Sequence, residues 1–214
     1  MAADEWLVSA ASERRTPFVR FYRWTNPAIS FGYFQPWARM AEPGVTAVRR
    51  ATGGGRVEHG ADFTFSVACP VGLWLAELDA TQGYEVVNRL VCGVLQEAGV
   101  ACHLHPDDLS ANADRAGLAC FVSPARHDVV SAAGSKLCGG AQRRSAKGLS
   151  YQGSIALSRL PQVPRATLAA ALRSAFGQLF GTTPAEFVPD PAAAAAIAAL
   201  AGAKYSTERW NRRR

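Results

Sequence analysis

The sequence predicts an α+β fold in which a mixed or antiparallel β-sheet is flanked by helices. Segments with strand patterns come in groups, with helices interspersed and without the regular alternation of strand and helix that marks a parallel α/β sheet. Residues 82–98 and 167–179 place apolar side chains at i, i+3 and i+4, which is typical of amphipathic helices. Each of these helices is long enough to cover one face of a sheet.

The first third of the chain is predicted to hold one helix and several strands. Residues 63–67 alternate strictly, with Phe63 and Phe65 on one face and Thr64 and Ser66 on the other, so this strand is expected to be half-buried. Pro27 separates two further strand patterns. Pro36 opens a helical turn, since proline is tolerated at the first position of a helix. The other predicted elements are a helix over 1–9, strands over 18–24, 28–33 and 45–48, and a helical turn at Pro36.

The rest of the chain is predicted to alternate loops, short strands and helices. A loop is expected over 103–114, short strands over 118–122 and 128–131, and a strand pair over 136–144 and 148–157. Prolines mark a linker near residue 184, the alanine-rich segment 192–201 is helical by propensity, and Ser206 or Thr207 is expected to cap a last short helix. We expect one domain over 1–214, with 182–214 as a C-terminal helical tail.

Three consecutive glycines, Gly53–Gly55, follow two arginines, Arg49 and Arg50, at the end of a strand-prone run. Glycine permits positive φ and lets another molecule approach the backbone closely. Exposed N–H groups beside the arginines would form a cradle for a phosphate, a carboxylate or a polarised carbonyl. The alternative interpretation is a glycine-rich hairpin that binds nothing.

Composition limits the classes of function. Formal net charge is +6, which suits an acidic protein partner or a solvated basic face, and no nucleic-acid-binding motif is present. Five cysteines without CxxC spacing argue against a zinc ribbon or a disulfide framework and for reduced thiols. No apolar run is long enough to span a bilayer and no signal peptide is recognised, so we expect a cytoplasmic protein without membrane contact.

Five segments, in order, resemble motifs of the biotin/lipoate protein ligase and octanoyltransferase superfamily. The glycine segment is similar to the family's R-R-x-[ST]-G-G-G-x-x-x-H signature, and the segment that contains Lys136 is similar to its D-[IV]-x-x-x-G-x-K-[IV]-x-G-x-A-Q-R element. The matching segments are Phe21–Gln35, Arg49–His59, Asp128–Arg143, Gln152–Ile155 and Tyr205–Trp210. Arg56 and Glu58 stand at positions where members of this family usually have small or apolar residues. This charged pair is therefore expected to alter the mouth of the pocket.

The resemblance implies the fold of a biotin-ligase-like catalytic domain, related to class II aminoacyl-tRNA synthetases. It implies that Lys136 is catalytic and that no metal is bound in the octanoyltransferase reading. His59 has two open interpretations: it takes part in catalysis, or it bonds the loop backbone and orders it. The residues implied to bind substrate are Arg49, Thr52, Gly53, Gly54, Gly55, His59, Gly139, Ala141, Gln142 and Gly153.

Cys120 distinguishes the branches of the family. Cys120-Phe121-x-x-Pro124 resembles a segment of cysteine-dependent octanoyltransferases whose cysteine carries the acyl group as a thioester. The alternative is a small buried hydrophobic residue, the usual environment of a free cysteine. Cys138 lies in a strand pattern and is interpreted as a core residue.

Three functions therefore stay open. The first is an octanoyltransferase that moves an octanoyl or lipoyl group through Cys120 to a lysine, without a cofactor. The second is an ATP-dependent lipoate-protein ligase, or its catalytic half, which would need ATP and Mg. The third is a non-catalytic member that binds acyl groups. The partners implied by the resemblance are an acyl carrier protein and a lipoyl-domain or glycine-cleavage H-type protein.

Overall fold

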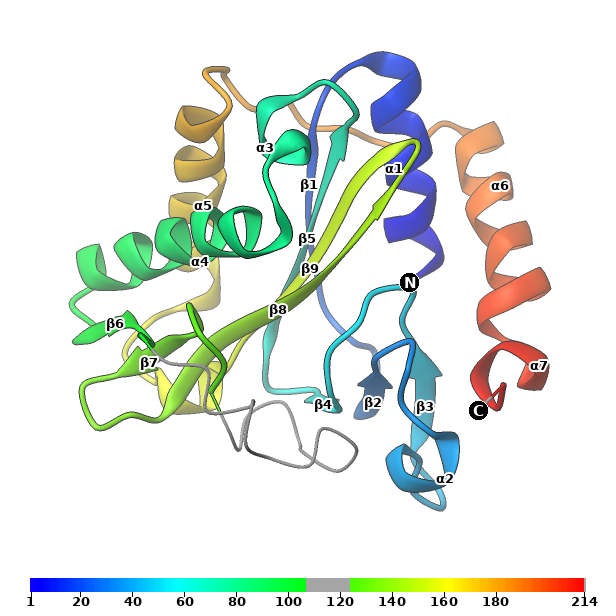
Figure 1. Cartoon of the computed structure of the whole chain (residues 1–214), viewed down its shortest axis with the longest axis horizontal. Helices are drawn as coiled ribbons and strands as arrows, with labels where there is room; N and C mark the ends of the chain where they lie inside the picture. Colours follow the sequence, from blue (N-terminus) through cyan, green and yellow to red (C-terminus); the bar gives the residue numbers. More distant parts are fainter. Residues whose placement is uncertain (107–123, 214) are drawn as a thin grey trace.

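The computed structural model describes residues 1–106 and 124–213 of the chain, and the described residues form two β-sheets with helices around them (Figure 1). The strands are β1 (Phe18–Tyr22), β2 (Ala28–Phe31), β3 (Thr46–Arg49), β4 (Val57–His59), β5 (Phe63–Pro70), β6 (Cys102–Leu104), β7 (Val129–Ser131), β8 (Lys136–Ser145) and β9 (Gly148–Ile155). The helices are α1 (Ala2–Arg14), α2 (Trp37–Met40), α3 (Trp74–Glu77), α4 (Ala80–Glu97), α5 (Arg165–Leu179), α6 (Pro191–Leu200) and α7 (Glu208–Asn211), with a 3₁₀ turn η2 (Leu157–Arg159) and a π-helical turn η3 (Ala201–Tyr205).

The larger sheet has the strand order β1-β5-β9-β8-β7-β6 and is antiparallel throughout. The smaller sheet has the order β3-β2-β4, in which β2 pairs parallel with β3 and antiparallel with β4. The predicted α+β class, with mixed and antiparallel pairing, is therefore confirmed.

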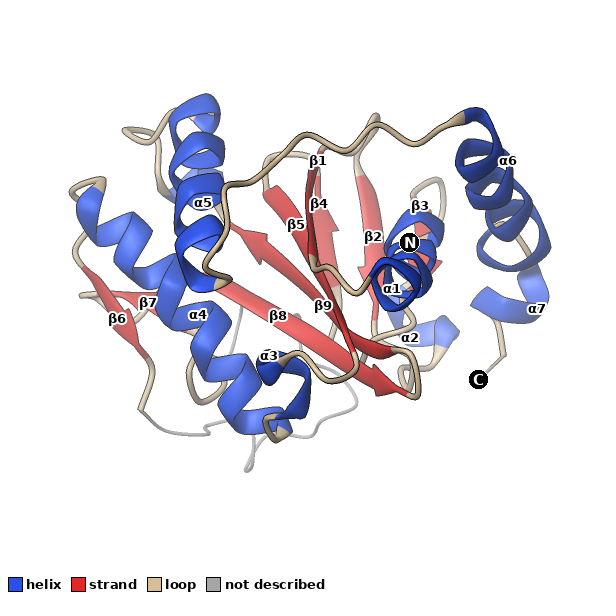
Figure 2. Ribbon diagram, turned by 90° about the horizontal axis from the view of Figure 1, so that it is seen from above, coloured by secondary structure: helices blue, strands red, loops and turns tan. Residues whose placement is uncertain are grey.

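Both faces of strand β5, the neighbour of the edge strand β1, are covered. Phe63, Phe65 and Val67 point into the main core, which α4 and α5 close (Figure 2). Ala68 packs on the opposite face against α1. The alternation predicted for this strand is confirmed, but the expectation of a half-buried strand is wrong, because α1 covers the face that carries the hydroxyl side chains.

Helix α4 begins two residues earlier than predicted because Asp79 caps it. The Asp79 side chain accepts from the backbone N–H of Gln82, and the Gln82 side chain accepts from the N–H of Asp79, so the two residues form a capping box. At the other end of the chain, Thr207 caps α7, as the sequence allowed. Helix α6 lies beside α1 in both views (Figures 1 and 2). The division into one domain with a tail stays a prediction.

Two local predictions are wrong. The glycine segment does not join a hairpin, because β3 and β4 both pair with β2 and not with each other. The segment connects two strands of the smaller sheet, whereas Lys136 begins a strand of the larger one. Within the predicted loop 103–114, residues 103–104 are in strand β6, and the strand predicted over 118–122 lies outside the described residues.

Within the described ranges, every helix is too short or too polar to cross a lipid bilayer.

Candidate active site

Lys136 is held in a buried ion pair. Its Nζ lies 2.7 Å from Oδ2 of Asp128, and both side chains are almost wholly removed from solvent. The Tyr84 hydroxyl donates to Oδ1 of Asp128 at 2.5 Å and accepts from the backbone N–H of Gly140 at 2.9 Å. An adjacent carboxylate favours the charged form of an amine, so the pairing keeps Lys136 an ammonium.

A bulge and a glycine position this lysine. The register between β7 and β8 shifts so that Val129 faces Cys138 and Val130 faces Lys136, which leaves one extra residue on β8. The shift brings Lys136 to the same face as Gly139. A Cβ on Gly139 would lie 2.4 Å from Cε of Lys136 and 2.8 Å from Oδ1 of Asp128, so the ion pair requires glycine there.

Arg50 holds the glycine segment against the pocket. Its Nη2 donates to the carbonyl oxygens of Gly53 and Gly55 at 2.9 and 2.7 Å. Gly54 has φ +84°, a conformation that favours glycine, and a Cβ on it would lie 3.3 Å from Cβ of Ala141 on β8. Strands β3 and β4, which flank the glycine segment, lie in the smaller sheet and β8 lies in the larger one, yet the glycine segment and β8 meet at Gly54 and Ala141.

Arg49 is placed differently from the prediction that it contacts substrate. The side chain is fully buried and donates to backbone carbonyl oxygens, including those of Tyr33 at 2.7 Å, Gln35 at 2.6 Å and Asn211 at 2.9 Å. The indole of Trp210 donates back to the carbonyl of Arg49 at 3.0 Å. Since neighbouring strand residues point to opposite faces, Arg49 ties α7 to β3 while Arg50 turns toward the glycine segment.

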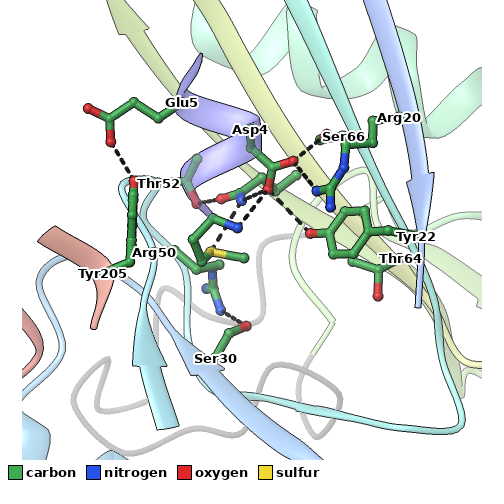
Figure 3. A network of polar contacts seen from close by, with 12 residues as sticks. Asp4, Glu5, Arg20, Tyr22, Ser30, Arg50, Thr52, Thr64, Ser66 and Tyr205 are labelled. Carbon is green, nitrogen blue, oxygen red and sulfur yellow. Dashed lines mark hydrogen bonds and ion pairs between the residues drawn. The ribbon is translucent and has the colours of Figure 1, made fainter. Parts of the chain in front are cut away.

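A buried polar chain links α1 to the start of the glycine segment (Figure 3). Thr52 donates to Oε1 of Gln152 at 2.7 Å, and Nε2 of Gln152 donates to Asp4 at 2.7 Å. Asp4 also accepts from Arg20 and Ser66, each at 2.8 Å. Burial by itself raises the pKa of Asp4, but nearby positive charge, including Arg20, and these hydrogen bonds outweigh it and hold the pKa below its ordinary value. Thr52 is thus fixed by an ionised carboxylate.

The ring nitrogens of His59 bond to side chains. One of the two interpretations from the sequence had His59 bonding the loop backbone instead. Its Nδ1 lies 2.8 Å from Oδ2 of Asp62 and its Nε2 lies 2.6 Å from Oγ of Ser30, while Trp24 stacks on the ring at 4.1 Å. Burial lowers the pKa of His59, the bond and charge of Asp62 oppose this, and the charge of Arg50 adds to the lowering. The net pKa falls below the ordinary value, so the imidazole is neutral at pH 7.

These groups line one cavity that is partly open to solvent. Its wall is shared by the two sheets and includes Ser30, Arg50, His59, Lys136, Ala141 and Gly153.

The structure brings together part of the predicted site. Lys136, His59, Gly139, Ala141 and Gly153 line the cavity. Thr52 and the glycine segment bond to two residues of the cavity wall: Thr52 donates to Gln152, and Arg50 donates to the glycine carbonyls. Arg49 lies away from it, and Gln142 turns its amide to the carbonyl of Ala80 at the start of α4. Arg56 pairs with Glu42 and Glu58, outside the cavity wall. Cys120 lies outside the described residues.

Sequence reasoning missed several residues that shape the site. Asp128 opens the motif that contains Lys136, and its position could have suggested a partner for the lysine. Ser30 belongs to another matched motif, but nothing local indicates a bond to a residue 29 positions away. Tyr84 lies on an amphipathic helix and carries no signal that separates it from an ordinary core aromatic.

The fold and the site define the class. A solved structure of lipoate-protein ligase A bound with ATP superposes with a TM-score of 0.80 at 21% identity and covers 99% of this chain and 92% of its own. A bipartite lipoate protein ligase from Thermoplasma acidophilum, described with its E2 lipoyl domain, gives a TM-score of 0.73 at 19% identity over 98% of this chain and 91% of its own. These likenesses confirm the expected fold.

Sequence similarity gives the family. Residues 1–190 match the model of the lipoyl protein ligase A/B catalytic domain, and the chain belongs to that family. A protein named octanoyltransferase LipM from Kyrpidia tusciae is 33% identical over 178 residues, which is 78% of this chain. The chain spans 65% of that relative's length. The resemblance found in the motifs is thereby confirmed.

Proposed function

We propose that this protein transfers an octanoyl group from a carrier thioester to a lysine of a lipoyl domain. The observation that carries the proposal is the buried ammonium of Lys136 on the wall of the cavity that the two sheets share. The relative named octanoyltransferase supports the acyl chemistry. A lipoyl domain as acceptor is suggested by the archaeal ligase described with one.

The role of Lys136 follows from its partner. Because Asp128 keeps it charged, Lys136 acts as a cation and not as a neutral base. An ammonium near a thiol lowers the thiol pKa, and the same charge stabilises the oxyanion that develops when the acyl carbonyl is attacked. Asp128 and Tyr84 act as positioning residues, since they fix where that charge sits.

We assign the nucleophile to Cys120 on the strength of the motif alone. The Cys120 thiolate would attack the carbonyl of the carrier thioester, and the carrier thiolate would leave and take up a proton from water. The target lysine amine would then attack the Cys120 thioester, lose a proton to water and release the Cys120 thiolate as the C–S bond breaks. This route consumes no nucleotide, so we propose that neither ATP nor Mg is needed. An acyl carrier protein as donor, an H-type protein as alternative acceptor and a cytoplasmic setting complete the proposal.

The test is transfer without nucleotide. Purified protein is mixed with octanoyl-acyl carrier protein and a lipoyl domain, and the lipoyl domain is weighed by intact mass spectrometry. We expect octanoylation without ATP and no gain when ATP and Mg are added. Transfer that starts from free octanoate or lipoate and depends strictly on ATP would replace the proposal by the ligase mechanism.

A further inference from the structure

Ser30, His59 and Asp62 form a continuous chain of hydrogen bonds that the acyl-transfer route does not use. Ser30 Oγ lies 2.6 Å from His59 Nε2, and His59 Nδ1 lies 2.8 Å from Asp62 Oδ2. Strands β2 and β4 pair so that Ser30 faces Val57, and Ser30 is thus the diagonal neighbour of His59 on the same face. All three side chains are buried, and Ser30 and His59 line the cavity.

The surrounding bonds fix where the protons lie. Asp62 Oδ2 also accepts from Thr64 and Ser154, each at 2.8 Å, and Asp62 is a carboxylate whose pKa is about 2. An ionised carboxylate can only accept, so Nδ1 of His59 carries the ring proton and Nε2 of the neutral ring is the acceptor. The carboxylate thereby orients the imidazole and selects its tautomer.

The environment of Ser30 determines the direction of its own proton. Nη1 of Arg50 donates to Ser30 Oγ at 2.9 Å, a contact visible in Figure 3. Since guanidinium has no acceptor, the single hydroxyl proton of Ser30 is free to point only at His59 Nε2. Arg50 also places a fixed positive charge beside the oxygen that would become nucleophilic.

We propose that Ser30, His59 and Asp62 act as a nucleophilic triad that hydrolyses acyl thioesters in this cavity. Ser30 Oγ attacks the acyl carbonyl, His59 Nε2 takes the Ser30 proton, and the C–S bond breaks as the thiol leaves with that proton. Water then attacks the Ser30 ester, His59 relays a second proton, and the free acid and the Ser30 hydroxyl are released. Arg50 is the cation that stabilises the developing oxyanion.

This activity would compete with transfer whenever no acceptor protein is bound. The choice of a thioester as substrate rests on the proposed function, whereas the reactivity of Ser30 rests on the triad geometry alone. The two can therefore fail independently, and the test is built to separate them.

The first measurement is covalent labelling with an octyl fluorophosphonate. Ser30 Oγ would displace fluoride from phosphorus, with the proton passing to His59. In the otherwise unchanged chain, peptide mapping should place one phosphonyl group on Ser30. His59→Gln should slow labelling on the order of a hundredfold, the scale of losing a general base. Ser131→Ala is the control, since Ser131 is a strand serine on β7 outside the cavity wall and should label like the parent.

The second measurement is hydrolysis of octanoyl-N-acetylcysteamine in a Cys120→Ala background, without acceptor. That background removes the proposed transfer route, so the remaining hydrolysis should disappear when Ser30→Ala is added. Mapping of the parent chain needs no variant and is unaffected by misfolding. Absence of a Ser30 adduct in folded parent protein, or equal hydrolysis with and without Ser30, would overturn the proposal.

Discussion

Arg49 and Lys136 are both buried almost completely, and of these two cations only Lys136 lies on the cavity wall. At the end of β3, Arg49 donates to backbone carbonyl oxygens of Tyr33 and Gln35, which precede α2, and of Asn211 in α7. These carbonyl groups are neutral dipoles. At the start of β8, Lys136 pairs with one carboxylate and lines the cavity. The comparison teaches that a buried cation is not in itself a site: Arg49 bonds backbone carbonyl oxygens away from the cavity, whereas Lys136 lies on the cavity wall.

The largest effect that would sharpen the comparison concerns Lys136. Lys136→Ala should lower octanoyl transfer on the order of a hundredfold or more, because the cation that stabilises the reacting groups is lost. Lys147→Ala is the matched control, since this exposed lysine lies outside the cavity wall and donates to the Ser9 hydroxyl. Steady-state rates with octanoyl-acyl carrier protein check it, and equal rates for the two variants would contradict the role of Lys136.

Removal of Lys136 also leaves Asp128 buried without its cation, which is itself destabilising. The double variant Lys136→Met, Asp128→Asn removes both charges and separates stability from catalysis. It should recover stability relative to Lys136→Ala while its transfer activity stays low. Recovery of activity together with stability would assign Lys136 a structural role like that of Arg49.

Arg49 should show the opposite pattern. Arg49→Met should lower the free energy of unfolding by about 3–5 kcal/mol, because several buried carbonyls lose their donor. The folded fraction should keep a transfer rate close to that of the parent. Chemical denaturation and rates corrected for folded fraction check this, with Arg173→Met, an exposed arginine that donates to the carbonyl of Pro184, as control. If Arg49→Met kept its stability but lost transfer activity, Arg49 would have to be a substrate-binding residue, as the resemblance implies.

Asp62 gives a pH-dependent contribution to stability. Burial raises its pKa, but bonds from His59 and Ser154 lower it from 3.8 to about 2. A depressed pKa stabilises the fold above the unfolded value and loses that contribution as pH falls from about 4 through about 2. Asp62→Asn should therefore cost about 2 kcal/mol at pH 7 and flatten the loss of stability between pH 4 and 2. Parallel pH profiles of the parent and the variant would contradict this, and Glu208→Gln serves as an exposed control.

Cys138 should have the smallest effect. The thiol is fully buried in the main core, and burial raises its pKa well above the ordinary range. Cys138→Ala should cost about 1 kcal/mol through lost packing and leave transfer unchanged. Thermal unfolding and transfer rates check this prediction. A large loss of transfer in Cys138→Ala would contradict the assignment of Cys120 as the reactive cysteine.

Local patterns predicted the local structure well. The alternation of Phe63, Phe65 and Val67 and the periodicity of α4 and α5 each reflect which face contacts the core, so the faces could be read from spacing alone. Burial of the Thr64 and Ser66 face could not be predicted, because it depends on α1, which is distant in sequence.

Pairing between distant segments was not predictable in the same way. The glycine segment looked like a hairpin loop, yet β2, earlier in the chain, inserts between its flanking strands. The bulge that brings Lys136 over Gly139 depends on the partner strand β7. Which of Arg49 and Arg50 faces the cavity likewise depends on how β3 sits between β2 and α7, and no local signal distinguishes two adjacent arginines.

The central claim, acyl transfer through a cysteine served by Lys136, is tested most directly by locating the acyl group. The protein is mixed with octanoyl-acyl carrier protein without acceptor, quenched in acid and mapped by mass spectrometry. The account predicts an octanoyl thioester on Cys120 that a lipoyl domain then discharges, and no adduct or transfer in Cys120→Ala. Full transfer activity in Cys120→Ala would contradict it.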